Sequence, residues 1–420
     1  MKQFLYLLTL VLLLGNQLIL AQTADENLPD TISPPKAQPQ HYLWLDASYT
    51  SFSNVLNASF FNALNGTSGI TSGALSGNFY DKGNYLLLDN TIALRYFNVN
   101  KTNSSIFRGF ALGYRQFLSS HFPAAAFSLL FHGNSAFAGD TASLDDANLN
   151  SQSYSFINTT FQFEFPLDEL QKSKIEWSIQ PALLVGHAAS TLQFTKAGLY
   201  TAPYGQFLDI YADYSWNASS SGLFSGIGAG LNTQLTWKTR NGWIASVTLQ
   251  NLGFIRYGSS SEQVQLDTAF HYEGIQFPVI TELNTFTPDT GFADALMDDF
   301  YENQKQSGSF TALTAARLEF GLIKYFKPVN ILVKAKSISY LQDFSMNYSS
   351  VDLAFMPFRK LSFSLNPGIV AYSHFYLNAG LRIRLGDLGA LSLEAGDLLG
   401  FFNPENSHFQ RLNCSLAFLF

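Results

Sequence analysis

The sequence predicts an all-β protein, a closed transmembrane antiparallel β-barrel of about 14 to 16 strands. Charged residues make up 13% of the chain and aromatic residues 15%, whereas soluble globular domains carry roughly 25% charged residues. Beyond the N-terminal leader there is no uncharged apolar run of the ~18 residues that a spanning helix needs. Apolar residues instead recur at every second position. Such a chain satisfies its backbone in lipid as a closed barrel.

The N-terminal residues predict a cleaved secretory signal. Lys2 precedes an apolar run from Phe4 to Leu14, and the small residue Ala21 ends the segment. The alternative is a retained membrane anchor, but the uninterrupted run is shorter than the ~20 residues that a bilayer requires. We therefore expect a signal peptide at 1–21, a flexible periplasmic segment at 22–41 and the barrel at 42–420.

Strand alternation is clearest in the middle of the chain. Apolar residues occupy alternate positions from Ile175 to Val185, from Leu223 to Trp237 and from Trp243 to Leu249. Asn241-Gly242 predicts a compact turn between the last two segments. A soluble β-sandwich would also alternate, but its outer face would carry Lys and Glu where these strands carry Leu, Ile, Phe and Trp.

The C-terminal decapeptide predicts the closing strand of the barrel. It alternates and ends on an aromatic residue, as the insertion signals of outer-membrane barrels do. The apolar positions that we expect to face lipid and to form this signal are Leu412, Cys414, Leu416, Phe418 and Phe420.

Two long segments do not alternate. Asn54 to Asn78 is rich in Asn, Gly, Ser and Ala, which makes it too irregular for a lipid-facing strand, so we interpret it as a possible plug in the lumen. Thr285 to Ser309 is acidic and predicts a long loop that offers a partner surface.

The segment from Val247 to Tyr257, with the ending from Gly380 to Phe420, resembles a family of uncharacterised outer-membrane barrels from Bacteroidota. More remotely that family is similar to FadL-type and PorV-type barrels, a fatty-acid transporter and a secretion component. The Asn-Pro-Ala motif near the N-terminus of those relatives is missing here, which weakens the implied fatty-acid transport role.

Charged residues and glycines in the polar phase predict the lining of the lumen. The two signs occur in similar number, which indicates a neutralised ion-pair network rather than a selectivity ring. Arg382 with Arg384 is an alternative anion site, and Asp209 with Asp213 an alternative cation site. Adjacent inward glycines leave room for a plug or a ligand. The lumen candidates are Arg95, Arg115, Glu176, Asp209, Asp213, Gly226, Gly228, Gly230, Arg382 and Arg384.

Catalysis and cofactors have little support in the sequence. There is no Gly-x-Ser-x-Gly motif, the seven histidines are scattered without metal-ligand spacing, and the single cysteine, Cys414, excludes an intrachain disulfide. We therefore predict no enzyme, no metal and no cofactor.

Two classes of function remain. The first is a non-enzymatic subunit of a larger outer-membrane machine for protein export, barrel assembly or surface display. The second is a FadL-like transporter for a small hydrophobic ligand. The expected partners are outer-membrane lipid, the barrel-assembly machinery for insertion, and other outer-membrane or periplasmic proteins. A net charge of −7 argues against nucleic acid.

Overall fold

The computed structural model describes residues 41–57, 60–61, 79–81, 83–98, 107–168, 173–273, 304–326, 329–341, 347–358, 360–370, 374–385, 389–398 and 407–419. The predicted signal peptide, the segment 22–40, residues 285–303 of the predicted loop and the terminal Phe420 lie outside these residues.

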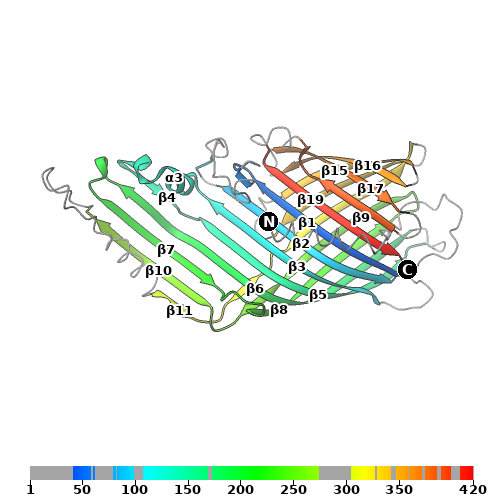
Figure 1. Cartoon of the computed structure of the whole chain (residues 1–420), viewed down its shortest axis with the longest axis horizontal. Coiled ribbons are helices and arrows are strands. Elements are labelled where there is room, and N and C mark those ends of the chain that lie inside the picture. Colours follow the sequence, from blue (N-terminus) through cyan, green and yellow to red (C-terminus); the bar gives the residue numbers. More distant parts are fainter. Residues whose placement is uncertain are drawn as a thin grey trace.

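Fourteen of the described strands form a closed antiparallel ring, which confirms the predicted fold class and strand number (Figure 1). Each pairs with the next, and the last pairs with the first through Tyr42 opposite Leu419. Ring closure excludes the sandwich alternative. The strands are β1 (His41–Ser53), β2 (Asn84–Asn98), β3 (Phe107–Phe122), β5 (Asn148–Pro166), β6 (Lys174–Thr201), β8 (Gly226–Lys238), β9 (Trp243–Tyr257), β13 (Arg317–Phe326), β14 (Ile331–Tyr340), β15 (Asn347–Phe358), β16 (Leu361–Val370), β17 (His374–Arg384), β18 (Gly389–Ala395) and β19 (Phe409–Leu419).

The outer face of the ring is apolar. Leu112, Ile157, Trp177 and Phe363 are exposed although they are large and apolar, and their chain neighbours point into the lumen. A soluble protein would bury such residues, so this pattern is that of a barrel whose outer face meets hydrocarbon.

The two ends of the barrel differ in their connections. At the end where β1 begins and β19 ends, called the end of the termini below, β8 and β9 are joined by the predicted turn. There the Gly242 N–H bonds to the Thr239 carbonyl and Gly242 has φ +76°. At the opposite end, the connections carry helix α3 (Ala124–His132) and the 3₁₀ turns η2 (Asn134–Phe137) and η3 (Pro203–Gly205). Short turns at the termini and long loops opposite are typical of outer-membrane barrels.

A sheet extends the barrel wall beyond the end opposite the termini. The second half of β6 pairs with β7 (Leu208–Ala218), and β7 pairs with β10 (Glu262–Tyr272). Figure 1 shows β7 and β10 leaving the barrel at its left side. Short strands complete this region: β4 (Asp140–Ser143) beside β6, β11 (Gln306–Ser307) beside β10 and β12 (Thr311–Leu313) beside β9. We call β7, β10 and the second half of β6 the extension.

The described part of the expected plug lies at this same end of the barrel. Val55, Leu56, Phe60 and Phe61 form a buried cluster with Phe127 of α3. Leu86, Leu88 and Phe122 pack against it, and in the register of β2 and β3 these three belong to the outward phase. The described contacts therefore do not support a plug, and residues 58–59 and 62–78 of this segment lie outside the described residues. Among the described residues, no helix is long and apolar enough to cross a membrane.

Candidate functional site

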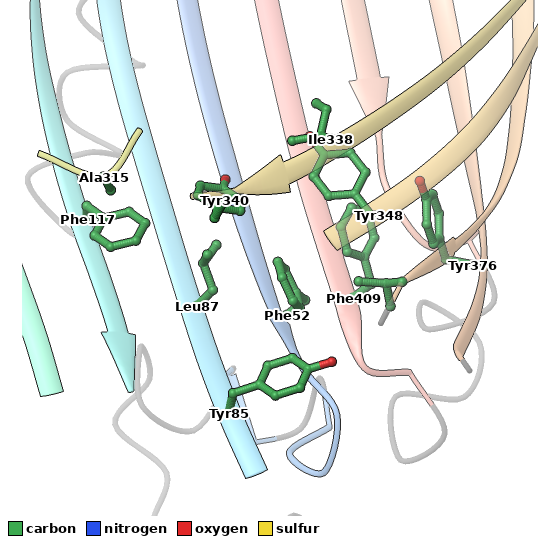
Figure 2. Close-up of a cluster of buried hydrophobic side chains, with 11 residues drawn as sticks. Phe52, Tyr85, Leu87, Phe117, Ala315, Ile338, Tyr340, Tyr348, Tyr376 and Phe409 are labelled. Atoms are coloured by element: carbon green, nitrogen blue, oxygen red, sulfur yellow. The ribbon is translucent and has the colours of Figure 1, made fainter. Parts of the chain in front are cut away.

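Side chains from opposite walls meet inside the barrel. Phe117 of β3 and Tyr340 of β14 have ring centroids 5.9 Å apart, although five strands of the described ring separate β3 and β14 along its shorter side. Figure 2 shows Leu87 and Phe117 beside Tyr340, with Phe52 and Phe409 next to them. The buried residues of this lumen cluster are Phe52, Tyr85, Leu87, Phe117, Ala315, Ile338, Tyr340, Tyr348, Val370, Tyr376 and Phe409.

A buried ion pair lies directly beside the lumen cluster. Arg115 of β3 donates from Nε to Asp89 Oδ1 at 2.8 Å and from Nη2 to Oδ2 at 2.9 Å, so the pair is bidentate. The Tyr340 hydroxyl donates to Asp89 Oδ2 at 2.9 Å from the far wall. Arg317 of β13 is 4.0 Å from the same oxygen. We call Asp89, Arg115, Arg317 and Tyr340 the lumen lock.

Arg115 binds a third element of the barrel through its remaining nitrogen. Its Nη1 donates to the Tyr154 hydroxyl at 3.0 Å and to the Ala315 carbonyl at 2.9 Å. Four of the five guanidinium N–H groups are thereby used. A buried charge is costly unless paired and hydrogen-bonded, and these contacts meet that condition in a side chain that is 1% exposed.

A local irregularity in the wall brings Ala315 to Arg115. The pairing of β9 with β12 ends at Phe254 and resumes with β13 at Gln250, which leaves Thr314–Ala316 without ladder pairing. Asn251 adopts φ +57°, and its N–H bonds to Asn232 Oδ1 at 2.6 Å. The Thr314 hydroxyl donates to the Asn251 carbonyl. These side-chain bonds, with the backbone bond from the Thr314 N–H to the Gly253 carbonyl at 3.0 Å, take the place of regular ladder pairing.

Nearer the termini the lumen is lined by ion pairs. Lys336 is 3.2 Å from Glu319, and Arg411 is 3.9 Å from Glu394. Glu176 lies between two lysines, Lys174 at 2.5 Å and Lys238 at 2.8 Å. This arrangement fits the predicted mixed-sign network.

The structure places most lumen candidates on the inner face of the ring. Arg115 is the centre of the lumen lock, Glu176 is paired as above, and Arg95 forms a partly exposed pair with Asp46 at 3.0 Å. Arg382 and Arg384 follow one another on the inner face of β17. Sequence reasoning missed Asp89 and Tyr340. Asp89 carried a usable signal, because it is a charge that directly follows the apolar run from Leu86 to Leu88.

The assignment of Asp209 and Asp213 to the lumen is wrong. Both residues lie on β7, in the extension, outside the ring of fourteen strands. Asp209 Oδ1 is 2.5 Å from His271 Nδ1, and Asp213 faces Lys196 across the ladder. The error has a physical reason: strand alternation continues when a strand passes the rim, so phase alone does not locate a residue along the barrel axis.

The three inward glycines make room for the protein's own walls. A Cβ on Gly228 would lie 1.9 Å from the Phe254 carbonyl oxygen, and one on Gly226 would meet Tyr257 and Ile255. Tyr257 and Ile255 belong to a second inner cluster with Tyr154, Leu184, Ala189 and Ala312. The described structure therefore fills this space with side chains from β5, β6, β9 and β12.

The residues of the predicted insertion signal lie on the strand that closes the ring. Leu412, Cys414, Leu416 and Phe418 face Tyr49, Ala47, Leu45 and Leu43 of β1. Leu412 is exposed on the outer face. Their role in insertion stays a prediction.

Two histidines join loops at the rim opposite the termini. The rings of His374 and His408 have centroids 4.3 Å apart, and His408 Nδ1–H donates to the Leu56 carbonyl at 3.1 Å. Burial, with His374 nearby, lowers the pKa of His408 to about 4. Across the described residues, no group of three or more His, Cys, Asp or Glu side chains is placed to hold a metal ion.

A closed fourteen-strand barrel with an apolar outer face and walls in contact across the lumen defines this chain as a barrel of the outer-membrane type. Residues 42–390 match a family described as a family of unknown function (DUF5723), and the chain belongs to that family. No curated protein matches the chain.

Solved structures with a similar chain path include both channels and an enzyme. The TodX deltaS2S3 mutant monoaromatic hydrocarbon channel is 9% identical, with 91% of this chain and 90% of that chain covered and a TM-score of 0.43. A Pseudomonas aeruginosa FadL homologue is 9% identical, with coverages of 90% and 88% and a TM-score of 0.37. Outer membrane phospholipase A from Escherichia coli is 8% identical, with coverages of 91% and 98% and a TM-score of 0.20. These likenesses concern the fold alone.

Proposed function

We propose that this protein is a non-enzymatic integral barrel of the bacterial outer membrane that acts as a subunit of a larger outer-membrane machine. The observation that carries the proposal is the contact of Asp89 and Phe117 with Tyr340 of the opposite wall. A barrel that serves as a general pore needs an aqueous lumen, whereas here buried side chains fill it at the level of the lumen lock.

The extension supplies a surface for a partner. Its register places Asp209, Asp213 and His271 on one face and Ile210, Tyr214 and Phe270 on the other. Such a two-faced sheet beyond the rim, outside the hydrocarbon, offers polar and apolar contacts to another outer-membrane protein.

The first test measures conductance in planar bilayers. Purified protein should give small or no steady conductance, and Phe117→Ala combined with Tyr340→Ala should raise it because both sides of the contact are removed. Phe363→Ala, on the outer face, is the control and should change nothing. Large steady conductance of the unaltered protein contradicts the proposal.

The second test identifies partners after extraction in mild detergent. Tagged protein should retain a defined set of proteins, and Asp213→Lys with Asp267→Lys on the extension should lower their recovery. These two positions face each other across β7 and β10. Gln234→Lys in the lumen is the control for an added lysine away from the extension. Isolation as a lone barrel contradicts the machine-subunit role.

The interrupted wall at Thr314–Ala316 favours a second candidate, a transporter for a small hydrophobic ligand. The missing ladder pairs lie beside the lumen lock, so a ligand that displaced Ala315 would reach both the lumen and the wall. Purification of the lone barrel with an apolar molecule bound inside it would support this alternative.

A further inference from the structure

The outer surface of the barrel carries a long groove with a volume of about 840 Å³. It crosses the strands from β8 to β17, and its lining is almost wholly apolar. Phe320, Val351 and Ile369 in this lining are exposed, and along their strands they alternate with inward residues such as Glu319 and Asp352. The groove therefore opens toward the membrane and not toward the lumen.

The registers of neighbouring strands define the shape of the groove. One row of directly paired residues crosses the strands from β8 to β16. Phe375 of β17 pairs with the last of them and ends the row. This row consists of Leu235, Val247, Phe320, Ser337, Ser349 and Ile369. Strands lie about 4.8 Å apart, so six steps give a length of roughly 29 Å. A second row two residues away gives a width of about 7 Å.

Small side chains form the floor of the groove and large ones its ends and sides. Ala245 and Ala335 occupy the second row next to Trp237 and Leu322. On the floor, the Ser349 hydroxyl donates to the Ser337 hydroxyl at 2.9 Å. The two hydroxyls thereby pair with each other, which suits a surface in contact with hydrocarbon.

The groove is the outer counterpart of the lumen lock. Arg317 and Tyr340 draw β13 and β14 toward Asp89 on the opposite wall. The same two strands carry Phe320, Ala335 and Ser337, which line the groove. Where the wall bends into the lumen, a hollow is left on the side that faces the membrane.

We propose that this groove binds an extended acyl chain of a membrane lipid as a resident ligand. The inference rests on the outer-membrane location proposed above. Water does not enter such an apolar hollow within the bilayer, and an empty one would lose dispersion contacts along its whole lining. The row crosses strands that in such barrels tilt by about 35 to 45°, so a chain lying in the groove runs obliquely along the wall. The groove's narrow width fits a chain better than a globular or strand-forming partner, which needs a broad face.

Native mass spectrometry of the protein released from a mild detergent tests the proposal. The unaltered protein should keep one lipid of phospholipid mass at collision energies that remove all others. Ala335→Trp fills the floor and should remove most of this adduct. Ala379→Trp is the matched control, because Ala379 of β17 lies on the same outer face but outside the groove. Absence of the adduct, or its equal retention in Ala335→Trp, overturns the proposal.

A second measurement needs no variant and covers the case in which Ala335→Trp does not fold. The protein is reconstituted in vesicles whose phospholipid carries a photoreactive diazirine on one acyl chain. After illumination, labelling per residue should be several-fold higher at Ala335, Ser337 and Ser349 than at the exposed outer positions Ile157 and Leu183. Even labelling overturns the proposal, and so does weaker labelling in the groove than at Ile157 and Leu183, because lipid would then not occupy it. Conductance does not enter either readout, so failure here is separate from failure of the machine-subunit role.

Discussion

Asp89 on β2 and Tyr340 on β14 stand 251 positions apart in the sequence and on opposite walls of the barrel, yet their oxygen atoms are 2.9 Å apart. This bond ties the two walls at a point where Asp89 also binds Arg115 with both carboxylate oxygens. A substitution at Asp89 or at Tyr340 therefore changes contacts on both walls of the barrel.

Asp89→Ala should destabilise the barrel strongly. It leaves Arg115 buried without its counter-charge, which costs about 3 to 5 kcal/mol. Asp89→Leu with Arg115→Met should recover much of the loss, because an apolar pair replaces the ions. The measurement is the free energy of unfolding from denaturant titration in detergent. Asp46→Ala is the control, since its pair with Arg95 is partly exposed and worth under about 1 kcal/mol. Equal losses at Asp89 and Asp46 would contradict a buried lock.

Arginine on the two faces of the wall should have unequal effects. Val247 is exposed on the outer face, so Val247→Arg should cost about 2 to 4 kcal/mol near the bilayer midplane. Gln234 points into the lumen and is solvent-exposed, so Gln234→Arg should cost much less. Folding yield into vesicles, followed by the gel-mobility difference between folded and unfolded protein, compares the two. A larger loss at Gln234 would contradict membrane insertion.

The inward glycines should differ in their tolerance of a methyl group. Gly228→Ala places Cβ against the fixed Phe254 carbonyl and should cost about 1 to 3 kcal/mol by overpacking. In Gly230→Ala the nearest atom is Leu184 Cδ1 at 3.3 Å, and this side chain can move. Thermal unfolding of the two variants measures the difference. If Gly230→Ala were the more harmful, the close approach of β8 and β9 would not be the reason for the glycines.

Acidification should loosen the rim at His408. Burial and His374 lower the pKa of His408 to about 4 from its ordinary 6.5. The unfolded chain therefore takes up the proton first, so the stability contributed by the neutral ring is full above pH 6.5 and lost as the pH falls toward 4. Hydrogen exchange of residues 54–57 and 407–408, corrected for its intrinsic pH dependence, should accelerate between pH 7 and pH 5. His408→Gln should remove most of that change, and an unaltered pH response in this variant would refute the assignment.

The fold was predictable because its signals are local. Alternation from Ile175 to Val185, the turn at Gly242 and the apolar phase of the last strand each occupy a few consecutive residues. The lumen lock was only half predictable: Arg115 stood out as a charge in a strand, but its partners come from β2, β5, β14 and the interrupted wall. Which inward residues meet depends on how the wall curves, and period-two patterning carries no information about curvature. The same limit misplaced Asp209 and Asp213.

The inward bend of β13 and β14 also means that the number of strands no longer sets the bore of the barrel. In a round barrel, the number of strands sets the diameter and hence the bore. Here opposite walls touch at Asp89 and Tyr340 and a groove hollows the outer face, so the perimeter set by fourteen strands encloses a smaller cross-section than a circle would. The outline in the membrane plane becomes concave on one side, and neighbouring molecules meet a barrel with a distinct front and back. A rotationally symmetric porin has no such polarity, and this chain can therefore orient whatever it contacts laterally.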